Sequence, residues 1–365
     1  MMANDSYKLE HMLISSYTYI KLKAYLKPTK DLHFDGLPKR YVNKTMTRMQ
    51  GNRYLMQAFN CDTDKYASYC VDLDTWKAER LELFSSFITS CFIEGKYMLV
   101  MSNHCSISIL RNLQKIGQIE INSKYQKCKN NKDICGRWSQ KASQTVYTLD
   151  KDGSLYKIEW KYIKNMKNKK DAKDCKELVK SNVTNFYMDG RLGLATFNKD
   201  YILSLESGTK VDLRQKIDSK VKWTIMTCVS KYWIVSGDCV NTGQAIIASI
   251  NKQGNVRSKL KFKQTSNGFN LGYGKNFAGI YSLQNVFTTG RRGIFLAIER
   301  DGCCHLISVH YGRLYKLKFI DSIVNLDVVK GEANRIVHCV TATGTKGEFI
   351  VGGYGWTRLV SVKLK

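Results

Sequence analysis

The stretch TVYTLDKDGSLYKIEW, residues 145–160, decides how the rest of the sequence is interpreted. Polar and apolar residues alternate on both sides of the segment 150–153, whose Asp and Gly residues tolerate the tight or left-handed backbone of a hairpin loop. The pattern predicts two antiparallel strands joined by a turn, and the apolar residues of both strands can share one face. These residues are Tyr147, Leu149, Tyr156, Ile158 and Trp160.

The same pattern recurs along the chain at intervals of roughly 40 to 60 residues, the spacing typical of repeated units. The recurrences are residues 53–76, 96–110, 191–207, 231–262, 293–320 and 338–365. Only residues 75–87 have a weak helical periodicity, and a connection between units is the alternative there. A single small sheet cannot bury both faces, whereas a ring of sheets does so. Seven units predict an all-β, seven-bladed β-propeller that occupies residues 1–365 as one domain; six or eight blades remain alternatives.

The repeated units resemble those of the WD40-like propeller superfamily. The resemblance rests on the strand–turn–strand–turn–strand pattern of residues 231–262 and 293–320 and covers nearly the whole chain. The family's Trp-Asp and Gly-His dipeptides are missing from this sequence. The resemblance implies that an N-terminal strand completes the last blade. We expect residues 12–22 to pair beside 358–364, and an independent strand of the first blade is the alternative.

The chain carries 58 Lys and Arg residues against 31 Asp and Glu residues, a formal net charge of +27. Such an excess favours binding to polyanions such as RNA, acidic proteins or anionic membranes. The alternative is a solvated surface that reflects a Lys-rich composition. RSKLKFK, residues 257–263, alternates cations along a strand, which fits either partner binding or protection of a sheet edge. TTGRRG, residues 288–293, is a second basic turn.

Two lysine-rich segments interrupt the strand pattern at residues 123–138 and 161–180. Both flank the hairpin at 145–160, so we expect two loop insertions whose lysines meet on one rim of the same blade. Lysine is a less specific phosphate ligand than arginine, so binding there would be electrostatic. The candidate polyanion- or partner-binding residues are Lys124, Lys127, Lys129, Lys132, Lys167, Lys169, Lys170 and Lys173.

Motifs of catalysis and metal binding are missing from the sequence. There is no Gly-x-Ser-x-Gly elbow, no phosphate loop that leads into a helix, and no pair of closely spaced cysteine pairs that would predict a structural zinc. We therefore expect no cofactor, no metal and no catalytic residue. A propeller hydrolase with an acid and a base at the mouth of the central channel is the enzymatic alternative.

The twelve cysteines are scattered and several lie in apolar strand patterns, where a free thiol behaves as a small hydrophobic group. With no secretory leader or transmembrane segment in evidence, we expect an intracellular protein of the cytoplasm or nucleus. The sequence thus predicts a non-enzymatic propeller that acts as a scaffold for other proteins of a complex. An RNA- or ribonucleoprotein-binding propeller with a lysine-rich rim is the alternative.

Overall fold

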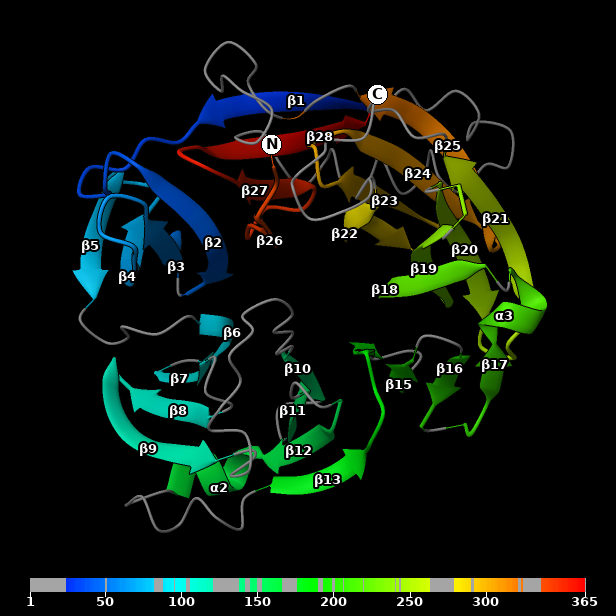
Figure 1. The fold of residues 1–365 in the computed structure, drawn as a ribbon, viewed down its shortest axis with the longest axis horizontal. Coiled ribbons are helices and arrows are strands. Elements are labelled where there is room, and N and C mark those ends of the chain that lie inside the picture. The colour runs from blue at the N-terminus through cyan, green and yellow to red at the C-terminus, as the bar shows by residue number, and fades with distance from the viewer. Residues whose placement is uncertain are drawn as a thin grey trace.

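In the computed structural model, the chain forms seven four-stranded antiparallel sheets arranged as blades of a ring (Figure 1). The structure describes residues 24–364 apart from several segments and some isolated positions. The segments are 82–87, 103–105, 121–137, 142–144, 150–152, 166–175, 190–192, 199–200, 263–278, 290–291, 321–322 and 324–335. The predicted all-β, seven-bladed propeller is confirmed.

The blades are numbered here in chain order. Blade 1 contains β2 (Tyr41–Arg48), β3 (Arg53–Asn60), β4 (Lys65–Asp72) and β5 (Lys77–Leu81). Blade 2 contains β6 (Ile88–Glu94), β7 (Tyr97–Ser102), β8 (Ser106–Arg111) and β9 (Gln114–Glu120). Blade 3 contains β10 (Trp138–Lys141), β11 (Thr145–Leu149), β12 (Leu155–Glu159) and β13 (Lys176–Lys180), with helix α2 (Trp160–Asn165) after β12. Blade 4 contains β14 (Asn185–Asp189), β15 (Gly193–Phe197), β16 (Tyr201–Ser204) and β17 (Lys210–Asp212), followed by helix α3 (Leu213–Lys216).

Blade 5 contains β18 (Val221–Val229), β19 (Tyr232–Cys239), β20 (Ala245–Asn251) and β21 (Val256–Phe262). Blade 6 contains β22 (Ile280–Thr289), β23 (Arg292–Glu299), β24 (Cys304–His310) and β25 (Arg313–Ile320). Blade 7 contains β26 (Cys339–Ala342), β27 (Glu348–Gly352), β28 (Thr357–Leu364) and the N-terminal strand β1 (Ala24–Asp31). The strands of blades 1–6 pair in chain order, from the inner strand to the outer rim (Figure 1).

The ring closes through β1, which pairs antiparallel with β28 from Ala24 opposite Leu364 to Asp31 opposite Arg358. An N-terminal strand therefore completes the last blade, but the prediction placed this strand too early in the chain. Both edges of β28 are occupied, one by β1 and the other by β27. Residues 12–22 themselves lie outside the described part of the chain.

The hairpin of blade 3 confirms the predicted strands and corrects the predicted face. Leu149 pairs with Leu155, whereas Tyr156 pairs with Thr148 and Ile158 pairs with Val146. Directly paired residues share a face, so Leu155 joins Tyr147 and Leu149 on the side towards blade 4. Tyr156 and Ile158 lie on the opposite side, against blade 2. The loop length sets the register, and a change of one residue exchanges the two faces.

Apolar side chains between neighbouring blades form the core. Between blades 4 and 5, the rings of Trp223 and Trp233 are each only 1% exposed and pack with residues of β15 to β21. Burying each large side chain contributes about 2–3 kcal/mol from the apolar area removed from water. The buried, free thiols of Cys228 and Cys339 belong to such clusters, as predicted.

Two segments differ from their predicted structure. Residues 75–87, with their weak helical pattern, contain the outer strand β5, which pairs with β4 from Asp72 opposite Lys77 to Ser68 opposite Leu81. The segment 161–180, predicted as a loop insertion, contains most of α2 and the whole of β13. The strands β5 and β13 form because each pairs with a neighbouring strand, and the local sequence pattern does not reveal such pairing. None of the helices in the described part of the chain has the length and apolar character needed to cross a bilayer.

Candidate functional site: the outer rim of the ring

The eight lysines predicted to bind a partner lie outside the described residues, so their convergence stays a prediction. They are Lys124, Lys127, Lys129, Lys132, Lys167, Lys169, Lys170 and Lys173. The described residues beside them show where the two segments join blade 3. Trp138 stands in register with Thr148, whereas Lys176 stands in register with Ile158, near the other end of the sheet. Trp138 and Lys176, the first described residues after the two segments, therefore lie at opposite ends of the blade.

The described rim of blade 3 places lysines beside aromatic rings. The Lys161 ammonium lies 4.9 Å from the centre of the Tyr162 ring, and the Lys176 ammonium lies 5.3 Å from that of Tyr156. Tyr162 is 46% exposed, and Leu178 on β13 is 52% exposed. Rings and cations of this kind are found at protein-binding and nucleic-acid-binding surfaces.

Acidic groups of blade 3 neutralise part of this charge. Lys157 forms an ion pair of 2.8 Å with Glu177, and Lys161 forms one of 2.7 Å with Glu159. The hydrogen bond from Lys161 lowers the pKa of Glu159, and the hydrogen bond to Glu177 raises the pKa of Lys157. This part of the rim therefore carries less free positive charge than its lysine content indicates.

A larger excess of positive charge lies on the outer side of blades 4, 5 and 6, where α3, β21 and β25 follow one another around the ring (Figure 1). We call its cations the basic rim. The segments 213–217, 256–262 and 311–317 that supply them contain no Asp or Glu. The seven cations are Arg214, Lys216, Arg257, Lys259, Lys261, Arg313 and Lys316, all exposed.

Neighbouring blades hold the basic rim together. Lys216 donates a hydrogen bond of 3.1 Å to the carbonyl of Gly254 in the turn before β21. On the other side, Lys316 lies 5.4 Å from the ring of Phe262, at the end of β21.

The sequence predicted that Arg257, Lys259 and Lys261 alternate along one face, and all three are exposed. Their register is less regular than predicted because a β-bulge interrupts the pairing of β20 with β21 at Arg257. Lys259 and Lys261 keep the alternation, opposite Ala248 and Ile246. Bulges and cations also protect sheet edges, so the edge-protection interpretation of β21 still stands. Lys263 lies outside the described residues.

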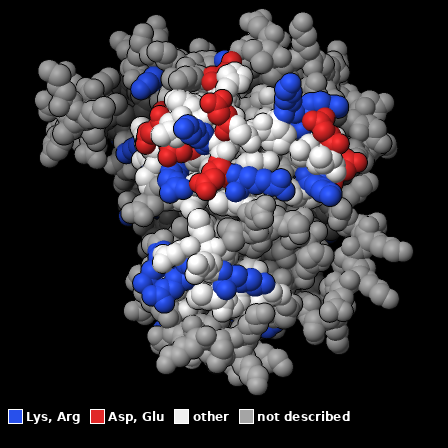
Figure 2. Space-filling model, turned by 90° about the vertical axis from the view of Figure 1, so that its left-hand side faces the viewer, with Lys and Arg blue, Asp and Glu red and all other residues white. Residues whose placement is uncertain are grey.

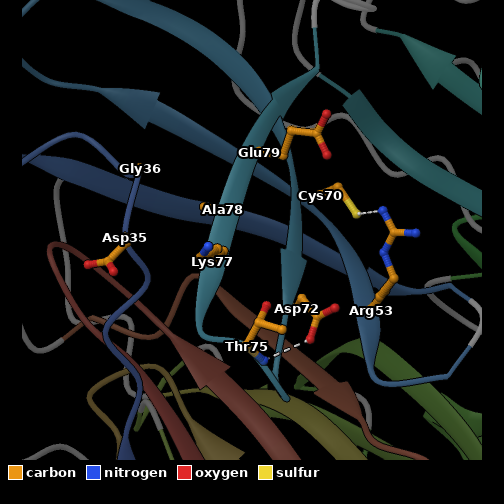
Figure 3. A pocket seen from close by; sticks show the side chains of 9 residues that line it. All are labelled: Asp35, Gly36, Arg53, Cys70, Asp72, Thr75, Lys77, Ala78 and Glu79. Atoms are coloured by element: carbon orange, nitrogen blue, oxygen red, sulfur yellow. Dashed lines mark hydrogen bonds between the residues drawn. The ribbon is translucent and has the colours of Figure 1, made fainter.

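The outer side of blade 1 contrasts with the basic rim. Figure 2 views this side of the ring and shows acidic and basic side chains interspersed. A shallow hollow of about 600 Å³ lies here (Figure 3). It is lined by Asp35, Gly36, Arg53, Cys70, Asp72, Thr75, Lys77, Ala78 and Glu79.

The backbone near Asp35 forms one edge of this hollow by bridging to β5. The Asp35 amide donates to the carbonyl of Trp76 at 3.0 Å, and the Ala78 amide donates to the carbonyl of Asp35 at 2.7 Å. Gly36 has a φ of +96°, and a Cβ there would overlap the carbonyl of Ala78. The close approach to β5 therefore requires glycine at this position.

Several side chains that line the hollow already form hydrogen bonds. Arg53 donates to the thiol sulfur of Cys70 at 3.0 Å. Asp72 accepts the amides of Thr75 and Asp74, at 3.1 and 2.8 Å, and these bonds lower the pKa of its carboxyl. Arg53, Asp72 and Lys77 stand in register across β3, β4 and β5 with alternating charge. Such a surface suits polar contact with a protein better than enclosure of a small molecule.

Among the described residues, a buried acid–base pair lies between blades 5 and 6. The Glu299 carboxylate and the His305 imidazole lie 2.6 Å apart, with side chains only 2% and 1% exposed. Burial raises the pKa of the nearby Asp238 to about 6, and the negative charge of Glu299 is the second cause of this rise. Solvent does not reach the His305–Glu299 pair, so it does not provide an acid–base site for a substrate. The part of the chain that the structure describes holds no cluster of three potential metal ligands.

Comparisons with known proteins agree on the architecture. No protein-family model matches the sequence, and the curated proteins give no significant match. BamB from Moraxella catarrhalis is similar with a TM-score of 0.50 and 12% identity, covering 92% of this chain and 98% of BamB. The WD40 β-propeller domain of Doa1 is similar with a TM-score of 0.54 and 10% identity, covering 92% and 97%.

A third similar structure is BBS1N in complex with ARL6DN, with a TM-score of 0.50, 11% identity and coverage of 93% and 96%. At these identities the similarity shows the fold alone. The chain is a seven-bladed β-propeller of the architecture that WD40 and BamB-type propellers share.

Proposed function

We propose that this propeller is a non-enzymatic scaffold whose basic rim binds an acidic segment of a partner protein within a larger assembly. The observation that carries the proposal is the charge of α3, β21 and β25: seven exposed cations on segments that contain no acidic residue. Cations gathered on one side attract an acidic partner and orient its approach.

Further observations support a protein partner. Tyr311 and Tyr315 border the basic rim and are 48% and 43% exposed, and tyrosine and arginine are enriched where proteins bind each other. Among the similar folds, BBS1N was solved in complex with a second protein, ARL6DN. The described cysteines are free thiols, which fits a reducing compartment such as the cytoplasm or nucleus.

RNA binding through the predicted lysines of residues 123–138 and 161–180 is the second candidate. The aromatic rings beside Lys161 and Lys176 favour it, because bases stack on such rings. The acidic pairing partners of Lys157 and Lys161 oppose it, because they reduce the charge offered to phosphates. We therefore favour the protein partner.

A binding measurement separates the two candidates. A fluorescent glutamate-rich peptide and a single-stranded RNA of equal charge are titrated against the protein over a series of salt concentrations. Neutralising Arg257, Lys259 and Lys261 to Gln should weaken peptide binding by about tenfold, because three exposed ion pairs contribute about 0.2–1 kcal/mol each.

The matched control neutralises Lys39, Lys65 and Arg80, three exposed cations at or beside blade 1, and should leave peptide binding unchanged. Equal loss in both variants would mean that only net charge matters and would overturn the proposal. Tight RNA binding that survives neutralisation of the basic rim, together with weak peptide binding, would replace it with the RNA candidate.

A further inference from the structure

Two cations and a histidine lie around the inner strand of blade 7. The inner strands of blades 1, 6 and 7 are β2, β22 and β26, next to the centre of the ring (Figure 1). Lys44 belongs to β2, Arg300 directly follows β23 in blade 6, and His338 directly precedes β26. We call Lys44, Arg300 and His338 the inner cluster. Lys44 and His338 are partly buried, whereas Arg300 is exposed.

A β-bulge in β2 sets Lys44 apart from the regular pairing of blade 1. The register of β2 with β3 shifts between Asn43 and Thr45, so Lys44 lies outside the ladder. A bulge re-aims the extra side chain, and bulges are common beside binding sites. On the inner edge of β2, the Asn43 amide donates to the carbonyl of Gly353 at 3.0 Å. This bond joins the bulge of blade 1 to blade 7.

Blade 7 holds His338 close to this junction. The His338 amide donates to the carbonyl of Gly352 at 2.9 Å, one residue before the carbonyl that β2 contacts. Burial lowers the pKa of His338 to about 3, and the positive charges of Lys44 and Arg300 contribute to this fall. The imidazole is therefore neutral at physiological pH and can donate one hydrogen bond from its ring.

Tyr281 on the inner strand β22 holds Arg300 towards His338. The Arg300 guanidinium lies 4.7 Å from the centre of the Tyr281 ring, and the Tyr281 hydroxyl donates to the His338 carbonyl at 2.6 Å. The Val337 amide also donates to the carbonyl of Arg300 at 2.8 Å. These contacts fix Arg300 beside the start of β26 before any ligand arrives, which reduces the entropy lost on binding.

No carboxylate of the described residues balances the two cations. Within the described ranges, the ion pairs include neither Lys44 nor Arg300. Two acids close to the cluster in sequence are engaged elsewhere: Asp62 pairs with Arg40 at 3.4 Å, and Asp301 accepts a backbone amide of its own turn. Burial lowers the pKa of Lys44, and the charge of Arg300 also lowers it. Like charges held together at a cost in stability are typical of a binding site for the opposite charge.

We propose that the inner cluster binds a small phosphate anion, either inorganic phosphate or a phosphate monoester, near the centre of the ring. The inference goes beyond the proposed function, because it needs neither the acidic partner nor the basic rim. A phosphate monoester has a charge between about −1.5 and −2, which matches two cations, whereas one carboxylate would leave a cation unbalanced. Arg300 can form two parallel hydrogen bonds to the phosphate oxygens, Lys44 adds a point charge, and His338 adds a neutral donor.

Thermal unfolding with added salts is the first test. Inorganic phosphate, glycerol phosphate and sodium chloride are compared at equal ionic strength and neutral pH. A ligand that binds only the folded protein raises the melting temperature as its concentration exceeds the dissociation constant. We expect both phosphates to raise the melting temperature above that in chloride, and the more effective one identifies the form of the phosphate. Equal effects of all three salts would overturn the inference.

Variants of the two cations locate the site. Lys44→Gln and Arg300→Gln should each weaken phosphate binding by about ten- to a hundredfold, because each removes a charge-assisted hydrogen bond. Arg300→Lys keeps the charge but loses the parallel hydrogen bonds, so its affinity should fall between the two.

The control variant combines Lys259→Gln with Lys261→Gln, two cations of the basic rim. It should bind phosphate as the unmodified protein does, although its binding to the glutamate-rich peptide is weakened. Lys44→Gln should show the reverse, so failure of the inference and failure of the proposed function are distinguishable. Equal loss of phosphate binding in the control variant and in Lys44→Gln would overturn the inference.

A measurement on the unmodified protein guards against variants that fold poorly. The imidazole NMR signal of His338, identified by its loss in His338→Gln, should shift and saturate as phosphate is added. A signal that does not move would overturn the inference. Without phosphate, Lys44→Gln should melt at the same or a higher temperature, because it removes a partly buried charge that Arg300 repels. A large fall would show that Lys44 is structural and would also overturn it.

Macromolecular phosphates are the remaining alternative. A phosphoserine peptide and a single-stranded RNA are therefore titrated as competitors of inorganic phosphate. If either one binds more tightly than the small phosphates and depends on Lys44 and Arg300, the site recognises a macromolecule and the inference is overturned.

Discussion

Glu299 and His305 form a buried pair, with 2.6 Å between the carboxylate oxygen Oε1 and the imidazole Nε2. Glu299 ends β23 and His305 lies near the start of β24, so the pair spans the hairpin that joins them. The ring of Phe262 on β21 lies 4.3 Å from that of His305, measured between ring centres. The pair therefore places polar groups in the packed interface between blades 5 and 6.

Removing one member of this pair should be costly. His305→Leu leaves the Glu299 carboxyl buried without its imidazole partner, and we expect a loss of about 3–5 kcal/mol in the free energy of unfolding. The double variant Glu299→Met with His305→Leu should recover most of this loss, because it buries no orphaned charge. Urea unfolding of the single and double variants measures both values. A double variant as unstable as the sum of the two single ones would show that the residues are not coupled.

Asp238 should make stability depend on pH. Its pKa is raised from 3.8 to about 6, so the folded protein holds a proton there that the unfolded chain releases. Stability therefore falls as pH rises from about 4 to about 6, and it stays lower at higher pH. The acidic neighbour is Glu299, and the opposing cation is Lys222.

Asp238→Asn should remove this dependence. We expect the variant to be about 1–3 kcal/mol more stable than the unmodified protein at neutral pH and equally stable near pH 4. Urea unfolding at the two pH values provides the measurement. The same gain at both pH values would show that the ionisation of Asp238 is not the cause.

The contribution to stability of the contact between Gly312 and blade 5 can be measured with Gly208 as a control. The φ of Gly208 is +66°, similar to the +82° of Gly312, and a Cβ on Gly208 would meet nothing within 4 Å. Gly208→Ala should cost about 1 kcal/mol for the left-handed backbone alone. Gly312→Ala should cost about 1–3 kcal/mol more, because its methyl group overlaps Tyr232 and Arg257. Chemical unfolding measures the loss in the free energy of unfolding for both variants. Equal losses would show that the contact between blades 5 and 6 at this turn adds no steric cost.

Local structure could be predicted because its determinants are close together in the chain. Turn residues such as Gly254, Gly302 and Gly312 have positive φ values where the sequence predicted turns. The exposed cations of β21 were likewise recognisable from their alternation. The closing strand was displaced from its predicted place, because Ala24 and Leu364 are at opposite ends of the chain and many apolar segments could fill that edge.

The candidate site depended on the tertiary structure to a greater degree. The basic turn at 288–293 was visible in the sequence, but its alignment with His310 and Arg313 follows from the register of three strands. Similarly, Glu299 and His305 carry no motif that marks them as partners. The predicted lysines of 123–138 and 161–180 stay a prediction.

By itself, the sequence determined the repeated antiparallel hairpin and the positive charge and favoured seven blades, because alternation, turn residues and composition are local properties. The tertiary structure alone decided which strand closes the ring, which side of each blade a residue faces, and which cations stand together. These follow from pairings between distant segments, where a shift of one residue reverses every side chain.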